Sequence, residues 1–183
     1  MTVMRPAVLD ASAAAALLLD EPAGARVEQI LRDWVARRRP RLVPSHFWLE
    51  IVHAMGRRAQ PSGDTVLAAV HRLDVFGLQT MEVDRPLLVQ VIDRVERFGL
   101  SSYDAAYLVL AESVDADLLT LDRQLAAAAG PRAITVVEGN DLQETPVFYE
   151  HDVTWPSYKG ASAYLAKLRA EALAGRSMAP QEG

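Results

Sequence analysis

The chain has 183 residues, 50% of them hydrophobic, which is enough to bury the core of one domain. It contains no cysteine, which excludes disulfides, thiolate metal sites and a cysteine nucleophile. The formal net charge of -5 argues against a protein that binds nucleic acid through its overall charge. The chain shows neither a secretory pattern nor a long apolar span, so we expect a soluble cytoplasmic protein without membrane contact.

Strands and helices are predicted to alternate along the chain. Apolar runs bounded by turn residues indicate the strands, and apolar spacing of helical period with capping residues indicates the helices. The prediction in chain order is a strand at 3–9, helices at 11–21 and 23–38, a strand at 41–44, helices at 46–58 and 65–77, a strand at 78–83, helices at 87–99 and 103–114, a strand at 117–122, a helix at 123–129 and a strand at 133–137.

This alternation predicts a three-layer α/β/α sandwich around a mainly parallel sheet. We assign residues 1–138 to one domain. Residues 139–183 have a different composition, and we interpret them as a C-terminal extension with a helix at 161–174, not as a second domain.

Three acidic residues are predicted to share one edge of this sheet. Asp10 and Asp122 each end a predicted strand, and Asp104 lies in the first turn of a predicted helix. The carboxyl ends of parallel strands border the crevice in which such sheets bind ligands. Asp104 also shares a helical face with Leu108 and Ala111, so we expect its carboxylate to point inward.

A fourth acid, Glu50, interrupts an apolar helical face. Its neighbours on that face are Phe47, Ile51 and Ala54, and a carboxylate among them is costly unless something pairs with it. Several converging carboxylates without matching bases either take up protons or hold a cation. Oxygen-only ligands suit Mg2+ or Mn2+, which can activate water for attack on a phosphodiester.

Each acid also has a simpler interpretation. Asp10 and Asp122 could cap the helices that follow them, and Asp104 could favour a helix dipole. Glu50 could pair with Arg57 or Arg58, although these lie further along the helix than the spacing of an ordinary ion pair. Ser12 and Thr120 lie close enough in sequence to Asp10 and Asp122 to orient a carboxylate or a metal-bound water, although they could equally be a cap and an ordinary strand residue. The residues alone leave these alternatives open.

The basic and imidazole side chains carry weaker signals. Clustered arginines can contact phosphate groups, but at helix ends they more often cap carbonyls and remain solvated. The candidates for phosphate contact are Arg37, Arg38, Arg39, Arg41, Arg57 and Arg58. We interpret the histidines as structural, because they show no metal-ligand spacing: His46, His53, His71 and His151.

With the four acids in this order, the sequence resembles the PIN-domain ribonucleases, and in particular the VapC-type toxins of bacterial toxin-antitoxin pairs. The matching segments contain Asp10, Glu50, Asp104 and Asp122, in that order: "VLDASAAAALLLDEP", "WLEIVHAM", "SSYDAAYLVLAE" and "LLTLDRQL". The resemblance implies a homodimeric endoribonuclease that depends on Mg2+ or Mn2+ and cleaves single-stranded RNA, often of the tRNA or rRNA class. It also implies inhibition by a VapB-type antitoxin, and it assigns metal binding and catalysis to the four acids. With RNA as the substrate, the six clustered arginines become candidates for contact with the RNA backbone.

Other functions remain as hypotheses. The fold could serve as a catalytically silent module that binds a partner, although all four acids are present. A receiver domain would need a lysine near a late strand, and a phosphatase of the haloacid dehalogenase type would need an acid where Ser12 stands. The extension departs from the family pattern. It could pack on the core and extend a dimer interface, occupy the groove of an antitoxin segment, or be a tether without a special role; a further hypothesis is that it inhibits the site through Lys167 or Arg169.

Overall fold

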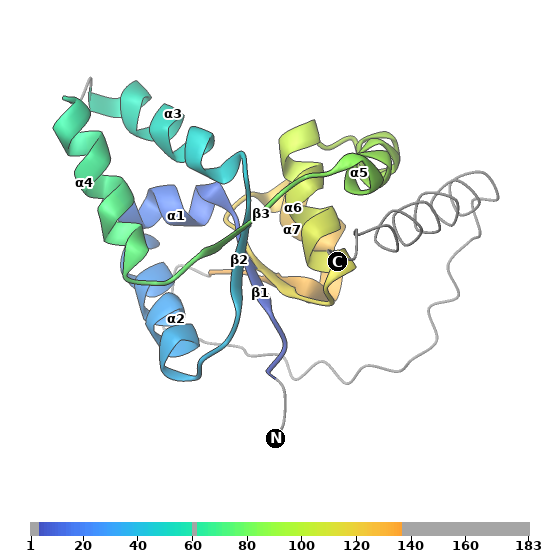
Figure 1. Cartoon of the computed structure of the whole chain (residues 1–183), viewed down its shortest axis with the longest axis horizontal. Helices are drawn as coiled ribbons and strands as arrows, with labels where there is room; N and C mark the ends of the chain where they lie inside the picture. Colours follow the sequence, from blue (N-terminus) through green and yellow to red (C-terminus); the bar gives the residue numbers. More distant parts are fainter. Residues whose placement is uncertain (1–3, 60–61, 137–183) are drawn as a thin grey trace, which may run out of the picture. The chain divides into compact units, whose positions relative to one another are not determined.

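A computed structural model describes residues 4–59 and 62–136 of the chain, without the side chains of residues 57–59 (Figure 1). The predicted extension at 139–183, including its helix at 161–174, lies outside the described residues, as do Lys167, Arg169 and His151. Within the described ranges, no helix is both long and apolar enough to cross a membrane.

Strands and helices alternate as the sequence predicts. The first half contains β1 (Ala7–Leu9), α1 (Ala11–Leu18), α2 (Gly24–Ala36), β2 (Arg41–Pro44), α3 (Phe47–Ala59) and α4 (Gly63–Asp74). The second half contains β3 (Gln79–Met81), α5 (Arg85–Phe98), α6 (Ser102–Ser113), β4 (Asp117–Leu119), α7 (Arg123–Ala129), the short 3-10 helix η1 (Gly130–Arg132) and β5 (Ala133–Ile134).

The strands form a parallel sheet in the order β3-β2-β1-β4-β5. The chain moves from β1 outward to β2 and β3, and then returns across the sheet to β4 and β5. Because crossovers between parallel strands are right-handed, the two directions place their helices on opposite faces. Figure 1 shows this arrangement, with α1 to α4 on one side of the strands and α5 to α7 on the other. The predicted α/β/α sandwich is therefore confirmed.

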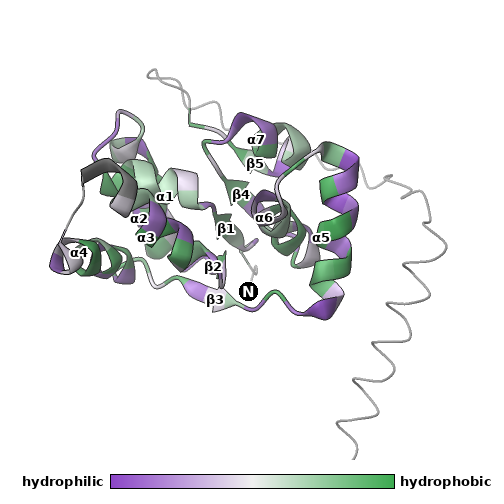
Figure 2. Cartoon of the chain, turned by 90° about the horizontal axis from the view of Figure 1, so that it is seen from above, coloured by the Kyte–Doolittle hydropathy of each residue, from purple (hydrophilic) through white to green (hydrophobic). Residues whose placement is uncertain are grey.

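The core explains why an apolar run follows Asp104. Helix α6 contacts α5, α7 and three strands, so almost all of it is enclosed, and every residue from Ala105 to Ala111 is buried. A helix that is apolar on all sides is typical of such a central position. In Figure 2, β1 and β4 at the centre are mostly hydrophobic, whereas α5 alternates between hydrophobic and hydrophilic residues.

Local sequence signals position several helix ends. Ser62, Asp84 and Ser101 each accept a backbone N–H at the start of a helix, which satisfies a donor that the helix itself cannot pair. Gly99 ends α5 with φ of 65°, a conformation that glycine adopts without a steric penalty. A Cβ at Gly24 would lie 2.5 Å from the carbonyl oxygen of Ala16, so glycine is required where α1 and α2 pack closely.

One predicted strand is too long. The sequence pattern predicts a strand at 117–122, but β4 ends at Leu119. The backbone N–H groups of Leu121 and Asp122 donate instead to the hydroxyl oxygens of Ser12, at 2.9 Å, and Thr120, at 3.0 Å. These side-chain contacts turn the chain away from the sheet. Asp122 consequently begins α7 and does not end a strand.

Candidate active site

The candidate site lies where the chain reverses its direction of travel across the sheet. Strands β1 and β4 are neighbours, and their helices leave toward opposite faces, which opens a crevice at their carboxyl ends. Asp10 directly follows β1, and Thr120 directly follows β4. The two side chains are hydrogen-bonded, with 2.7 Å between Thr120 Oγ1 and Asp10 Oδ2.

Asp10 is the buried centre of this site, with only 3% of its surface exposed. Its Oδ2 accepts hydrogen bonds from the hydroxyls of both Ser12 and Thr120. Each hydroxyl oxygen in turn accepts a backbone N–H, from Leu121 for Ser12 and from Asp122 for Thr120. The hydroxyl hydrogens are thereby directed at Asp10. This leaves Oδ1 as the carboxylate oxygen that neither hydroxyl occupies.

Capping does not explain Asp10, although the residue occupies the N-cap position of α1. Its side chain makes no capping hydrogen bond there. Burial raises the pKa of the Asp10 carboxyl, and the charge of Asp104 raises it further, while the hydrogen bonds from Ser12 and Thr120 act in the opposite direction. A buried carboxylate with a raised pKa, in a crevice at a strand end, is typical of functional sites.

Glu50 reaches the same site from α3. It is half-buried, and its Oε2 accepts a hydrogen bond of 2.6 Å from the phenol of Tyr107 on α6. Burial raises the pKa of Glu50, the Tyr107 hydrogen bond lowers it, and the charges of Asp10 and Asp104 raise it. The pKa of Tyr107 is raised as well, by burial and by the charges of Asp10 and Glu50, so its hydroxyl stays protonated and acts as a donor.

Asp104 is the third carboxylate of the site. It is half-buried in the first turn of α6, where Ser101 Oγ donates to its Oδ2 at 2.6 Å and accepts its backbone N–H at 3.1 Å. Its charge raises the pKa of both Asp10 and Glu50. The structure therefore brings three of the four predicted acids within electrostatic reach of one another.

Asp122 lies at the rim of this group. It is exposed, and its Oδ1 caps α7 by accepting the backbone N–H of Leu125 at 2.6 Å. Its own N–H joins it to the site through Thr120. The simpler interpretation of Asp122 as a helix cap therefore accounts for Oδ1. The cap does not use Oδ2.

The residues fit a hard divalent cation in chemistry and charge. The charge of Asp104 raises the pKa of Asp10 and of Glu50, so negative charge is concentrated here, and the three carboxylates offer the oxygen ligands that Mg2+ and Mn2+ prefer. Within residues 4–59 and 62–136, no three acidic or histidine side chains are close enough together to hold an ion as they stand. Binding a metal would therefore require the carboxylates to draw together.

The sequence interpretation missed His46. Its ring lies against those of Tyr103 and Tyr107, and its Nε2 is 3.7 Å from Glu50 Oε2. This Nε2 is buried and has no hydrogen-bond partner. Burial lowers the pKa of His46, which favours the neutral ring. The available signal was that His46 precedes Glu50 by one helical turn.

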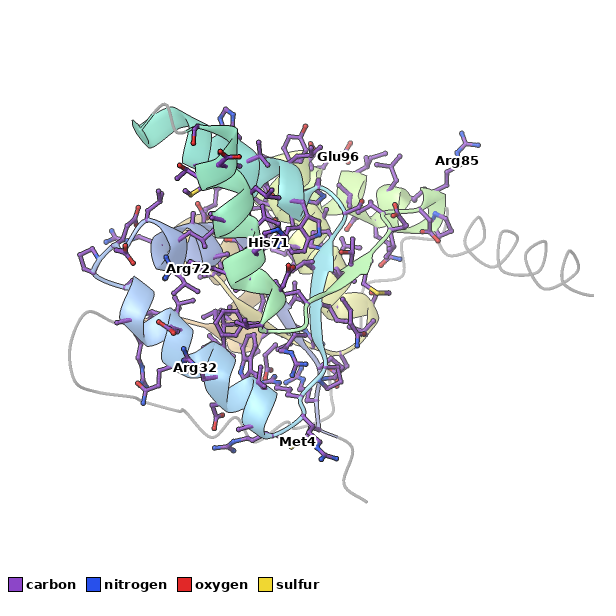
Figure 3. All side chains as sticks on the ribbon, turned by 60° about the vertical axis from the view of Figure 1, so that its left-hand side comes forward. Met4, Arg32, His71, Arg72, Arg85 and Glu96 are labelled. Carbon is purple, nitrogen blue, oxygen red and sulfur yellow. The ribbon has the colours of Figure 1, made fainter. Side chains whose placement is uncertain are left out.

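The other described histidines lie apart from this group. His53 is exposed on α3. His71, on the surface of α4 (Figure 3), contacts Asp74 with 2.9 Å between Nδ1 and Oδ2. The structure records no contact between either of these described histidines and the carboxylates of the site.

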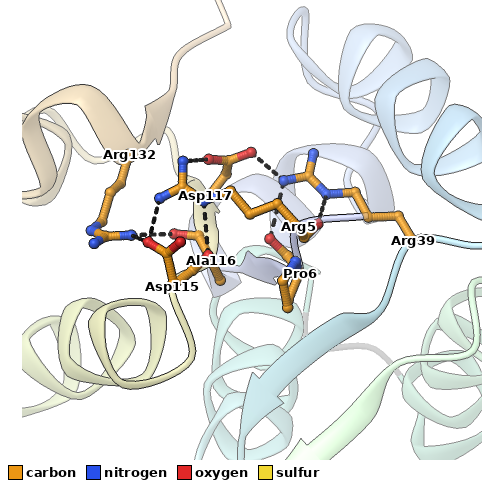
Figure 4. A network of polar contacts seen from close by, with 7 residues as sticks. All are labelled: Arg5, Pro6, Arg39, Asp115, Ala116, Asp117 and Arg132. Carbon is orange, nitrogen blue, oxygen red and sulfur yellow. Dashed lines mark hydrogen bonds and ion pairs between the residues drawn. The ribbon is translucent and has the colours of Figure 1, made fainter. Parts of the chain in front are cut away.

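Two of the arginines predicted to contact RNA have structural contacts at the opposite edge of the sheet. Arg39 donates to the carbonyl oxygens of Arg5 and Pro6, at 2.7 and 3.0 Å, and pairs with Asp117 at the start of β4 (Figure 4). Arg41 donates to backbone carbonyl oxygens, among them that of Arg39 at 2.7 Å. The structure therefore does not bring these side chains to the carboxylates.

The remaining arginines divide into two groups. Arg37 forms a surface ion pair of 2.8 Å with Asp33, and Arg38 is exposed at the end of α2, with φ of 54°. Arg57 and Arg58 belong to α3, but their side chains lie outside the described part of the chain. Contact of these residues with RNA stays a prediction.

Comparison with known proteins agrees with the fold. The structure is similar to the crystal structure of PAE2754 from Pyrobaculum aerophilum, with a TM-score of 0.54 and 24% identity over 91% of this chain and 96% of that one. A toxin-antitoxin complex from Klebsiella pneumoniae aligns with a TM-score of 0.53 and 16% identity, over 72% of this chain and 98% of that one. No curated protein matches the sequence significantly.

The PIN domain family matches residues 7–131, a range that begins with β1 and contains Asp10, Glu50, Asp104 and Asp122. This range also covers every helix of the two outer layers. Because the match extends over most of the sequence and includes the whole site, the chain belongs to the PIN domain family.

Proposed function

We propose that the protein is a metal-dependent endoribonuclease toxin of the VapC type, which cleaves single-stranded RNA of the tRNA or rRNA class. The observation that carries the proposal is the position of Asp10, buried at the carboxyl end of β1 and within electrostatic reach of Glu50 and Asp104. PIN domains are generally nucleases, and a cluster of carboxylates suits hydrolysis of phosphodiester bonds with Mg2+ or Mn2+.

The proposed metal ligands are Asp10, Glu50 and Asp104, with the free oxygen of Asp122 completing the set. A bound divalent ion would lower the pKa of water and offset the negative charge that develops on the phosphate. The protein's own contribution is to hold the ligands in place. Tyr107 restrains Glu50 and Ser101 restrains Asp104 through the hydrogen bonds described above.

Ser12 and Thr120 have a related role in the proposal. Their hydroxyls hold Asp10 through Oδ2, and we propose that Oδ1 is the oxygen that binds the metal. Because backbone N–H groups occupy the hydroxyl oxygens, the two side chains keep this orientation. We propose that they are supporting residues and do not contact the reacting phosphate.

The proposed partners follow from the resemblance to VapC-type toxins. They are a VapB-type antitoxin, a second copy of the chain in a homodimer, and the RNA substrate. The similar fold from Klebsiella pneumoniae, which belongs to a toxin-antitoxin complex, supports the first of these. We assign the PIN domain to residues 1–138 and propose that residues 139–183 are an appendage to it.

The test is cleavage of a total RNA pool, with the cut sites mapped by sequencing. We expect the wild type to cleave with Mg2+ or Mn2+ and to stop with EDTA, while Asp10→Asn and Asp104→Asn leave the RNA intact. Asp64→Asn, which removes an exposed carboxylate from α4, serves as the matched control and is expected to keep full activity. Unchanged cleavage by Asp10→Asn would contradict the assignment. An inactive wild type that still binds a partner would favour a silent module.

A further inference from the structure

Three aromatic rings lead from the buried core of the site to its surface. Tyr107 is completely buried, and its ring meets that of His46 edge to face, with 5.1 Å between centroids. His46 in turn contacts the ring of Tyr103, with centroids 5.3 Å apart and the planes tilted by 54°. Tyr103 is 57% exposed. Ring contacts thus lead from Tyr107, which donates to Glu50, through His46 to Tyr103, which is open to solvent.

Two features set Tyr103 apart from an ordinary exposed aromatic residue. It immediately precedes Asp104 in the first turn of α6, and its ring contacts His46, whose Nε2 lies 3.7 Å from Oε2 of Glu50. Its ring is also supported, because His46 packs against it and Tyr107 packs against His46. A supported aromatic ring loses little conformational freedom when a flat ligand stacks on it.

His46 supplies a second, independent observation. Its Nε2 is buried without a hydrogen-bond partner, although a carboxylate oxygen of Glu50 lies 3.7 Å away. An unsatisfied buried nitrogen costs free energy, and such groups persist where function requires them. Here the ring contacts both tyrosines from this position.

We propose that Tyr103 is a stacking platform for an unpaired base of the RNA, next to the phosphodiester that is cleaved, and that His46 positions its ring. The inference rests on the proposed ribonuclease function and adds a requirement to it. Proteins that bind single-stranded nucleic acid commonly stack bases on aromatic side chains, and this contact tolerates any base because each has a flat face. A base inside a duplex is not available for such stacking, so the site selects unpaired RNA.

The test measures RNA binding and cleavage separately. A short single-stranded RNA that contains one mapped cut site is prepared with an abasic nucleotide at each position in turn. For the Asp10→Asn protein, we expect one position beside the cut site at which loss of the base weakens binding about tenfold. When Tyr103→Ala is added, overall binding should fall by the same factor, and the abasic penalty at that position should disappear.

Three variants distinguish stacking from a general effect on the fold. Tyr103→Phe keeps the ring and is expected to bind as the parent protein does, and His46→Phe is expected to keep most of the stacking affinity. Leu67→Ala removes an exposed apolar side chain, 54% exposed, from α4 and is expected to change nothing. In the active background, Tyr103→Ala should raise KM more than it lowers kcat.

The outcomes separate this inference from the proposed function. If Tyr103→Ala binds RNA within twofold of its parent, or if the abasic penalty persists in that variant, the stacking role is wrong even though cleavage may be normal in the wild type. If the wild type cleaves no RNA, the proposed function has failed. In that case no cut site exists, and the role of Tyr103 in stacking a base beside it fails together with the proposed function.

Discussion

Tyr107 on α6 donates its phenolic hydrogen to Oε2 of Glu50 on α3, across 2.6 Å. The two residues come from helices on opposite faces of the sheet, so this contact joins the two outer layers at the carboxylate site. It also restrains a charged side chain that burial and its acidic neighbours would otherwise push toward the protonated form.

Replacement of Tyr107 by phenylalanine tests the contribution of that hydrogen bond. The ring is kept, so we expect the fold to survive with a loss of about 1 kcal/mol in the free energy of unfolding. We expect the affinity for Mn2+ to fall by about 10- to 100-fold, because Glu50 loses the group that orients it. Calorimetric titration and urea unfolding measure the two effects. An unchanged Mn2+ affinity would show that Tyr107 serves packing alone.

Asp122 offers a way to separate helix capping from metal binding. Asparagine caps a helix about as well as aspartate does, whereas alanine costs about 1 kcal/mol. We therefore expect Asp122→Asn to keep the thermal stability of the wild type and Asp122→Ala to lose part of it.

Both Asp122 variants should cleave RNA about tenfold more slowly if the free oxygen of Asp122 helps to hold the metal. Initial rates at fixed Mn2+ concentration measure this effect. Full activity in Asp122→Asn would restrict the residue to its role as a cap.

The raised pKa values of Asp10 and Glu50 predict how the metal-free protein responds to pH. Their ordinary values are 3.8 and 4.5, and both are raised in the folded state. Over the range between the ordinary and the raised values, the folded protein binds more protons than the unfolded chain. The free energy of unfolding therefore falls as the pH rises through this range.

Asp10→Asn removes the contribution of Asp10 to this pH dependence of the free energy of unfolding. In EDTA at pH 7, we expect the variant to be more stable than the wild type. The difference in their free energies of unfolding should narrow as the pH is lowered toward 5. Urea unfolding at several pH values measures the difference. The hydrogen bond from Arg132 lowers the pKa of Asp115 from its ordinary value of 3.8. Asp115 therefore changes the free energy of unfolding only below that pH and does not affect this comparison. A wild type that is the more stable protein at pH 7 would contradict the proposed repulsion among the acids.

Two neighbouring arginines should differ in their effect on stability. Arg39 has only 12% of its side chain exposed and holds the start of β1 to the start of β4, so we expect Arg39→Ala to cost about 3 kcal/mol of unfolding free energy. Arg37 pairs with Asp33 on the surface, where the loss should stay below about 0.5 kcal/mol. Chemical denaturation of both variants checks this, and equal losses would remove the structural role of Arg39.

The sequence predicted the fold well because its signals are local. Capping residues such as Ser62 and Ser101, and the alternation of apolar runs, indicate the elements without any knowledge of tertiary contacts. The right-handed crossover rule then places the helices on both faces of the sheet. Asp10 and Asp104 could be placed at the same edge for the same reason.

Long-range contacts account for what the sequence did not predict. The length of β4 depends on Ser12, which accepts the N–H of Leu121 from 109 positions along the chain. The structural role of Arg39 depends on Asp117, 78 positions away. No local pattern contains either contact. His46 was different, because its spacing from Glu50 was visible, but only the structure shows the buried nitrogen and the tyrosines around it.

The most direct measurement is calorimetric titration of Mn2+ into the wild type and into Asp10→Asn, with Glu96→Gln, an exposed site on α5 (Figure 3), as control. We expect the wild type and Glu96→Gln to bind Mn2+ with the same affinity and Asp10→Asn to bind at least tenfold more weakly. Equal affinity of the wild type and Asp10→Asn would contradict the claim that these carboxylates form the metal site of a nuclease.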